Sequence, residues 1–243
     1  MRKLIIPISV GIMCTSFTII VPEKLQPVAA VELAVPAASP ATVKTPSATL
    51  LFNNLELEKA GLSKEAFDLA WNGYQKLLSN GKLSKSSYLS ICDFSQSSGK
   101  KRLYIIDVVN GNLLYNTWVA HGRNSGGEFA TKFSNTPESL QSSLGFYITS
   151  DTYFGEHGLS LRIKGVDPGF NDKAMARNIV IHGAKYVDAA RAKSGIMMGR
   201  SFGCPALPQK ESAGIINTIK NGSCLFIYHP NKHYLQGSKI LNG

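Results

Sequence analysis

Hydrophobic positions recur with two different periods along the chain, and the period changes near residue 85. Between Ser63 and Asn80 the apolar side chains have helical spacing, with Ser63 as a capping residue before them and Asn80-Gly81 as an end signal after them. This pattern predicts one amphipathic helix. We expect the helix to pack on the rest of the protein and to carry no chemistry of its own.

After this helix the apolar residues alternate with polar ones, which predicts strands. Residues 103–108 and 113–119 flank Asn110-Gly111, a dipeptide typical of a two-residue type I′ hairpin. The other expected elements are strands at 145–149, 159–164, 178–182 and 223–228 and helices at 184–193 and 209–220. The sequence therefore predicts a mainly β domain, a β-rich α+β fold with peripheral helices.

The N-terminus has the composition of a targeting segment. Arg2 and Lys3 precede an apolar run from Leu4 to Val21, and small residues suited to cleavage follow at 28–30. This order is typical of a signal peptide over residues 1–30, although the apolar run also approaches the length of a membrane anchor. We expect an exported protein of the periplasm or cell envelope, with membrane contact through this segment alone.

Composition divides the rest of the chain. Residues 31–48 are rich in alanine and proline, which predicts an extended linker. We expect an N-terminal helical segment at 49–84, a main domain at 85–230 and a C-terminal tail at 231–243. A chain of 243 residues is long enough for one sizeable core with such an appendage.

The chain is basic, with 26 lysines and arginines against 16 acidic residues and a formal charge of +10. A positive net charge favours anionic surroundings, such as an envelope polymer or a membrane surface. The lysines are scattered and no nucleic-acid recognition motif accompanies them. We therefore expect no nucleic-acid partner.

Three cysteines remain once a signal peptide is removed, namely Cys92, Cys204 and Cys224. An odd number in an exported protein leaves at least one thiol unpaired. Cys92 and Cys224 lie in strand-like runs, which predicts buried, unreactive side chains; a disulfide between them is the alternative.

The strongest candidate chemistry joins His182 to Cys204. His182 ends an apolar strand, and Gly183 after it allows a carbonyl to face the ring, while Cys204 follows Gly203 in a loop. A cysteine nucleophile needs a base that raises its thiolate fraction and N–H groups that hold the oxyanion. The pattern predicts Cys204 as nucleophile and His182 as base. A buried structural cysteine and a structural imidazole are the alternatives.

Ser201, Arg200 and His121 are the candidates for substrate binding. Arg200 would favour the thiolate and pair with substrate carboxylates, and His121 stands where a strand opens into a flexible loop. A solvated arginine and an exposed loop histidine are the alternatives. Metal-ligand spacings and nucleotide-binding loops are missing from the sequence, so we expect no metal and no cofactor.

These residues resemble the murein L,D-transpeptidase catalytic-domain family, whose signature is a strand histidine followed by Ser-x-Gly-Cys. Here that signature is His182-Gly183 and Ser201-Phe202-Gly203-Cys204, and the stretch from Thr136-Pro137 to Gly145-Phe146-Tyr147-Ile148 resembles the family's strand entry. The resemblance covers roughly residues 85–230. Phe202 and Pro205-Ala206-Leu207-Pro208 depart from the common branch and indicate a divergent one.

The resemblance implies a function in cell-wall biogenesis. Cys204 would attack a peptidoglycan stem tetrapeptide, release D-alanine through a thioester and transfer the acyl group to an amine, giving a 3→3 cross-link. Gly183 would supply the carbonyl that orients His182, and the N–H groups of Gly203 and Cys204 would hold the oxyanion. Carbapenem-type inhibitors would acylate Cys204. An L,D-carboxypeptidase or amidase using the same acyl-enzyme, and a non-catalytic wall-binding module, are the competing interpretations.

Overall fold

The structure of the protein is a computed structural model that describes residues 47–198 and 201–243. The predicted signal peptide at 1–30, nearly all of the predicted linker at 31–48, and Arg200 lie outside the described residues. Among the helices of the described part, none is long and apolar enough to cross a membrane.

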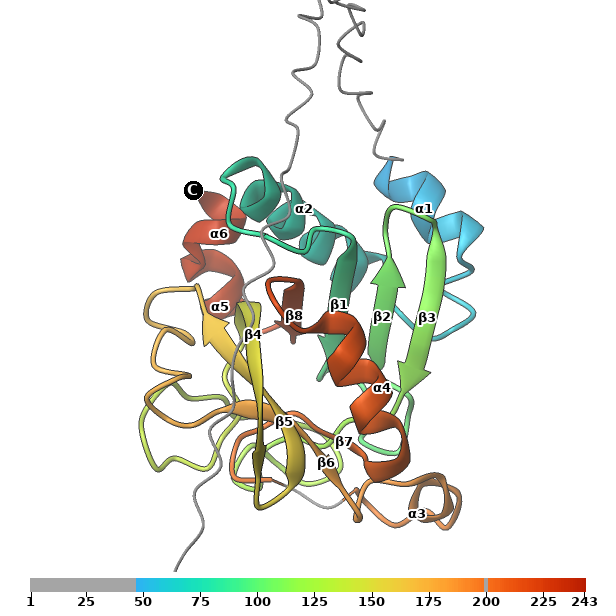
Figure 1. The fold of residues 1–243 in the computed structure, drawn as a ribbon, viewed down its shortest axis with the longest axis vertical. Coiled ribbons are helices and arrows are strands. Elements are labelled where there is room, and N and C mark those ends of the chain that lie inside the picture. The colour runs from blue at the N-terminus through green and yellow to red at the C-terminus, as the bar shows by residue number, and fades with distance from the viewer. Residues whose placement is uncertain (1–46, 199–200) are drawn as a thin grey trace, which may run out of the picture. The chain divides into compact units, whose positions relative to one another are not determined.

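The described chain forms one mixed sheet with helices around it (Figure 1). The helices are α1 (Ala48–Asn54), α2 (Lys64–Ser79), α3 (Ala189–Lys193), α4 (Gln209–Ile219), α5 (Lys232–Gly237) and α6 (Lys239–Asn242). The strands are β1 (Tyr88–Asp93), β2 (Leu103–Asp107), β3 (Asn112–Thr117), β4 (Gly145–Gly155), β5 (Gly158–Gly165), β6 (Val180–Ala184), β7 (Ala206–Pro208) and β8 (Cys224–Tyr228). The mainly β fold with peripheral helices predicted from the sequence is confirmed.

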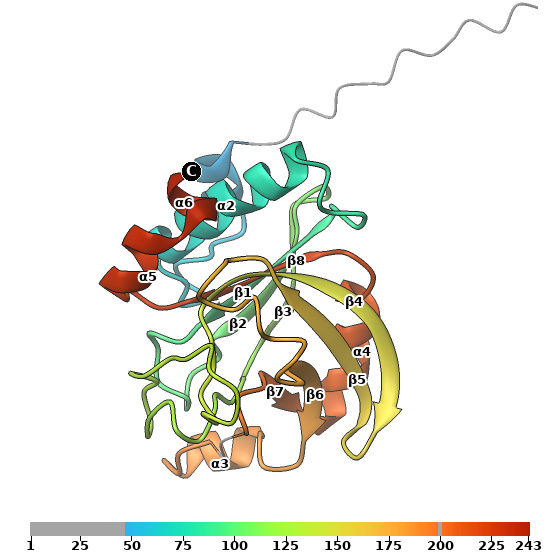
Figure 2. The ribbon, with the colours of Figure 1, turned by 90° about the vertical axis from the view of Figure 1, so that its left-hand side faces the viewer.

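The order of strands across the sheet is β3-β2-β1-β8-β4-β5-β6-β7. The pairs β1–β8 and β6–β7 are parallel and the remaining pairs are antiparallel. Figure 2 shows α1, α2, α5 and α6 gathered over one end of the sheet, and α4 packs against β5, β6 and β7. Because β8 lies between β1 and β4, the C-terminal strand joins the two halves of the sheet into one core.

Helix α2 is the helix predicted from the sequence. The Ser63 hydroxyl accepts the Ala66 N–H at 3.2 Å at its start, and Asn80 follows its last residue. Its apolar face packs into the same core as the sheet. A Cβ on Gly73 would lie 2.0 Å from Cζ of Phe146 on β4, so the absence of a side chain there lets helix and strand approach.

The hairpin between β2 and β3 has a longer turn than predicted. Asp107 pairs with Asn112, so the loop comprises residues 108–111 and not the dipeptide Asn110-Gly111 alone. Gly111 has a φ of +65° whereas Asn110 does not have a positive φ, which excludes type I′. The Asp107 carboxylate accepts the N–H groups of Val109 and Asn110 at 3.1 and 3.0 Å and stabilises this wider turn.

Three other segments differ from the sequence-based expectation. The helix expected at 184–193 is reduced to α3, because Ala184 still belongs to β6 and pairs with Pro208 of β7. Strand β4 continues to Gly155. The expected tail at 231–243 contains α5 and α6, whose Tyr234 is buried in the core.

Cys92 and Cys224 are free, fully buried thiols on neighbouring strands. In the register of β1 with β8, Cys92 pairs with Ile227 and Cys224 pairs with Leu89. The two sulfurs are therefore offset along the strands. The prediction that they are buried small hydrophobic residues is confirmed, and the alternative disulfide is not formed.

Candidate active site

Strand β6 carries His182 into the interior, where its side chain is 4% exposed. The strand pairs with β5 through Ser160 and with β7 through Ala206. Nδ1 of His182 lies 3.0 Å from the carbonyl oxygen of Gly183. Because a carbonyl can only accept, Nδ1 carries the proton in the neutral ring and Nε2 remains as the basic nitrogen.

Packing also explains why position 183 is a glycine. A Cβ at this position would lie 2.5 Å from Oγ of Ser212 on α4. Helix α4 therefore packs directly on the backbone of β6, which holds the carbonyl of Gly183 in place against the imidazole.

The parallel pairing of β6 with β7 places Cys204 beside Val180. His182 pairs with Ala206, so Cys204, two residues before Ala206, lies level with Val180, two residues before His182. The Val180 N–H donates to Sγ of Cys204 at 3.4 Å, and Sγ lies 3.7 Å from the carbonyl oxygen of Asn178. Two residues along a strand span about 7 Å, so His182 is the next side chain along the same face.

Cys204 and His182 line one cavity of about 440 Å³, together with residues from β4, β5 and the loops before β6 and β7. The hydrogen bonds of Sγ within the described residues go to Val180 and Asn178, not to the imidazole. In ligand-free enzymes catalytic hydrogen bonds are often long or poorly aligned, and they tighten only when substrate binds.

The charges of the pair follow from its burial. Desolvation raises the pKa of Cys204, against the N–H of Val180, the guanidinium of Arg177 and the N–H of Cys204 itself, which lower it. Desolvation lowers the pKa of His182, against its contact with Gly183, which raises it. At neutral pH the resting pair is therefore a thiol and a neutral imidazole.

The loop before Cys204 is shaped by Ser201. Its hydroxyl donates to the carbonyl of Cys204 at 2.5 Å and accepts the Gly203 N–H at 3.1 Å. Gly203 has a φ of +126°, and a Cβ there would lie 2.9 Å from the carbonyl oxygen of Gln141, so glycine suits this position. The Gly203 N–H, expected as an oxyanion donor, is thus engaged with Ser201.

His121 lies away from the cavity. Its side chain is fully buried, with Nδ1 2.8 Å from a guanidinium nitrogen of Arg102 and its ring edge-on to Phe94. Its backbone carbonyl accepts the Ser201 N–H at 3.0 Å. The residue thus supports the loop of Ser201 through its backbone, and its ring does not face the cavity in which a substrate would bind.

Two cavity residues had no assigned role in the sequence analysis. The Arg177 guanidinium donates to the carbonyls of Ser134 and Gln141 at 2.7 and 2.6 Å and favours the thiolate of Cys204. The His157 ring is stacked on His182. Arg177 lies in a polar loop and His157 in a turn, and no local motif distinguishes either residue, so tertiary contacts alone identify them.

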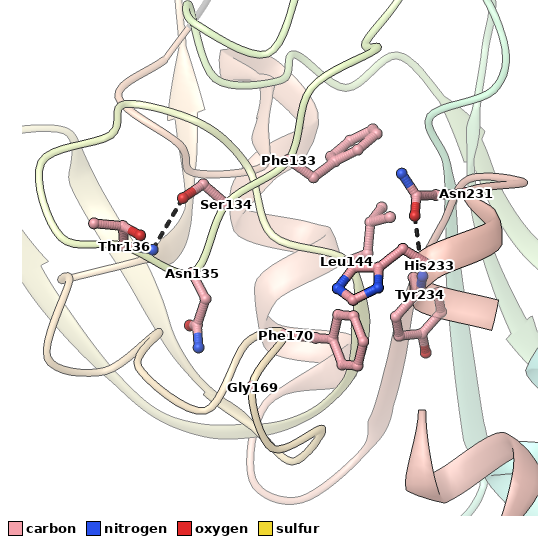
Figure 3. A pocket seen from close by; sticks show the side chains of 10 residues that line it. All are labelled: Phe133, Ser134, Asn135, Thr136, Leu144, Gly169, Phe170, Asn231, His233 and Tyr234. Carbon is pink, nitrogen blue, oxygen red and sulfur yellow. Dashed lines mark hydrogen bonds between the residues drawn. The ribbon is translucent and has the colours of Figure 1, made fainter. Parts of the chain in front are cut away.

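A second cavity, of about 280 Å³, lies away from Cys204 and His182 (Figure 3). Polar side chains that line it are hydrogen-bonded within the protein. The Asn231 side chain accepts the Tyr234 N–H at 3.0 Å, and the Asn135 side chain donates to Asp172 at 2.8 Å. Neither Cys204 nor His182 lines it, so the first cavity is the candidate active site.

Comparison with known proteins gives a family match over most of the chain. Residues 58–228 match the family model described as the L,D-transpeptidase catalytic domain. This range contains α2, the sheet and both His182 and Cys204. In a search of curated proteins, no sequence matches the chain.

Three solved structures illustrate the similarity that a search by structure finds. An L,D-transpeptidase from Mycobacterium smegmatis is 11% identical with a TM-score of 0.37, over 59% of each chain. The LD transpeptidase LdtMt1 in complex with imipenem is 12% identical with a TM-score of 0.37, over 58% of this chain and 59% of that one. The helical cell shape determining protein Pgp2 from Campylobacter jejuni is 15% identical with a TM-score of 0.39, over 66% of this chain and 57% of that one. The matched regions span less than two thirds of these three proteins.

Proposed function

Since the chain belongs to the L,D-transpeptidase catalytic-domain family, we propose that it is a cysteine acyltransferase that cross-links peptidoglycan stem peptides. The observation that carries the proposal is the shared cavity of Cys204 and His182, with Nδ1 of the imidazole held by the Gly183 carbonyl. This arrangement supplies a nucleophile, a base with one available nitrogen, and a group that orients the base.

In the proposed acylation, Nε2 of His182 takes the proton of Cys204 as Sγ attacks the carbonyl carbon between the third and fourth residues of a stem tetrapeptide. The new C–S bond leaves a negative charge on the carbonyl oxygen. When this intermediate collapses, the C–N bond to the terminal D-alanine breaks. His182 returns the proton to the leaving nitrogen, and a thioester remains on Cys204.

The resting protonation state supports general-base catalysis. Burial favours the neutral thiol and the neutral imidazole, so the proton moves during the attack and the enzyme does not store a thiolate. Arg177 and the Val180 N–H then stabilise the negative charge on sulfur as it forms. The Cys204 N–H is the oxyanion donor in this proposal, because the Gly203 N–H donates to Ser201. Losing one oxyanion donor typically lowers kcat by a factor of about 10²–10³.

In the second half-reaction we propose that the side-chain amine of a diamino acid on a neighbouring stem attacks the thioester. A C–N bond forms, the C–S bond breaks, and the amine proton passes through His182 to Sγ. The product is a 3→3 cross-link. Water in place of the amine would give a trimmed stem, which is the reaction of a carboxypeptidase.

We propose that this chemistry takes place in the periplasm or cell envelope. The N-terminal composition is typical of an exported chain, and the net charge of +10 favours an anionic wall. The acyl donor and acceptor of the proposed reaction are both parts of peptidoglycan, which is found in that compartment.

Mass spectrometry of muropeptides tests the reaction. The purified chain without its first 46 residues is incubated with sacculi that carry tetrapeptide stems, and 3→3 dimers with released D-alanine are expected. Trimmed monomers without dimers would replace the transpeptidase with a hydrolase.

The matched variants are Cys204→Ala and Cys224→Ala. The first should form no thioester and no product, while circular dichroism shows that the fold is retained, because Cys204 is a half-buried loop residue. The second removes a buried thiol outside the cavity and should keep activity. Turnover by Cys204→Ala would refute the assignment of the nucleophile.

A further inference from the structure

The ring of His157 lies flat on the ring of His182. The two centroids are 4.3 Å apart and the ring planes differ by 21°. His182 is 4% exposed, whereas His157 is an exposed residue. The outer ring therefore covers a face of the inner one that would otherwise meet solvent.

His157 reaches this place through the hairpin of β4 and β5. Gly155 pairs with Gly158, so Glu156 and His157 form the turn that connects the strands, and Gly158 has a φ of +76° that a tight turn needs. Figures 1 and 2 both show this turn at the end of the molecule that also holds β6 and β7. A segment far from β6 in sequence thus brings a second imidazole to the catalytic base.

The stacked pair borders two cavities. One is the cavity of Cys204; the other, also of about 440 Å³, is lined by residues of β6 and by Gln209 of α4. His157 and His182 line both of them. Removal of the His157 ring would therefore uncover His182 where the two cavities meet.

We propose that His157 is a positioning residue that holds the imidazole of His182 in the orientation required for proton transfer with Cys204. The inference rests on the proposed function of the Cys204 cavity. The Gly183 carbonyl fixes one ring nitrogen of His182 and the His157 ring fixes one ring face. The imidazole is then held at one ring nitrogen and on one ring face, which restricts both its position and its rotation.

The same contact reduces the exposure of the His182 ring to solvent. Desolvation is the main cause of the lowered pKa of His182, and the neighbouring His157 lowers it further. The other titratable or charged side chains that line the two cavities are Tyr153, Glu156, Arg177, Lys185, Tyr186 and Cys204. A neutral base is needed to accept the thiol proton, so covering His182 favours the reactive form at neutral pH.

Two variants separate stacking from other roles. In His157→Ala the cover is lost, and we expect kcat to fall by about 10- to 100-fold, as misplacement of a catalytic group does. KM should change little, because His157 acts through His182. In His157→Phe an aromatic ring remains, so kcat should stay within about threefold of wild type, since stacking of aromatic rings does not require the imidazole nitrogens.

The readout specific to positioning is the titration of His182 itself. The pH dependence of its ring proton resonances, followed by NMR without substrate, should show a higher pKa in His157→Ala, because the ring is rehydrated. His157→Phe should restore most of the lowered value. This measurement needs no turnover, so it tests the stack even if the proposed reaction proves wrong.

His233→Ala is the matched control. His233 is also an exposed histidine against an aromatic ring, Phe170 at 5.2 Å, but it lines the second cavity. It should leave the His182 titration and kcat unchanged. An unchanged His182 pKa in His157→Ala would overturn the proposal. A loss of kcat in that variant without a change in the titration would also overturn it, because His157 would then act on the substrate directly.

Discussion

The Val180 N–H donates to Sγ of Cys204 at 3.4 Å, although Val180 begins β6 and Cys204 lies 24 residues later in the loop before β7. In a regular sheet this N–H would donate to a backbone carbonyl, whereas here it donates to the sulfur. This contact exists because β6 and β7 run in parallel and His182 pairs with Ala206. The contact holds the Cys204 thiol beside Val180, two residues before His182 on β6. The N–H also stabilises the sulfur when it becomes negative.

Covalent labelling by a carbapenem should identify the nucleophile. The strained carbonyl of the inhibitor presents the same electrophile as the stem peptide, so we expect one adduct on Cys204. Intact-mass spectrometry should detect it in wild type and in Cys224→Ala, and peptide mapping should locate it. An adduct that persists in Cys204→Ala would place the reactive group elsewhere.

The pH dependence should reveal a neutral resting pair. Burial holds the pKa of His182 below its usual range and the pKa of Cys204 above its usual range. Activity needs His182 unprotonated, so kcat/KM should rise with pH through a midpoint below about 6.5 and then level off.

Alkylation by iodoacetamide tests whether the pKa of Cys204 is raised. The reaction needs the thiolate, so its rate should still be rising at pH values above about 8.5. Cys204→Ala gives the background from the two buried thiols. A rate that is already constant near neutral pH would show a stored thiolate–imidazolium pair.

Ser201→Ala should impair catalysis because it loosens the loop that carries Cys204. It removes the hydroxyl that donates to the Cys204 carbonyl and accepts the Gly203 N–H. Loss of such a hydrogen bond corresponds to about 1 kcal/mol, so kcat/KM should fall roughly 5- to 10-fold. Ser201→Thr, which keeps the hydroxyl, should recover part of the loss. The control Ser194→Ala changes an exposed serine near the end of α3 and should behave like wild type. Wild-type kinetics for Ser201→Ala would exclude a role for this loop geometry.

Gly73→Ala tests whether α2 and the sheet share one core. The new methyl group would overlap the Phe146 ring, and overpacking of a core typically costs about 1–3 kcal/mol. Urea unfolding should show this loss in the free energy of unfolding. Asn72→Ala, on the exposed side of the same helix, should be neutral or slightly stabilising. Equal stability of Gly73→Ala and wild type would mean that the helix packs more loosely than described.

The sequence by itself determined the local features of this protein. Ser63 and Asn80 mark the ends of α2 because capping depends on neighbouring backbone groups. Alternation of apolar residues marked most of the strands, and Gly183 after His182 indicated the carbonyl contact that the structure contains. These features involve residues within a few positions of one another, so their physical cause is visible in a short stretch of sequence.

Tertiary structure decided which distant residues meet. The pairing of β6 with β7 brought Cys204 to Val180, the β4–β5 turn brought His157 to His182, and a buried Arg102 held the ring of His121 away from the cavity. Strand order and register depend on the whole core, because shifting one strand by a residue reverses every side chain on it. The composition of a site therefore follows from long-range packing even where its reactive residues are recognisable in the sequence.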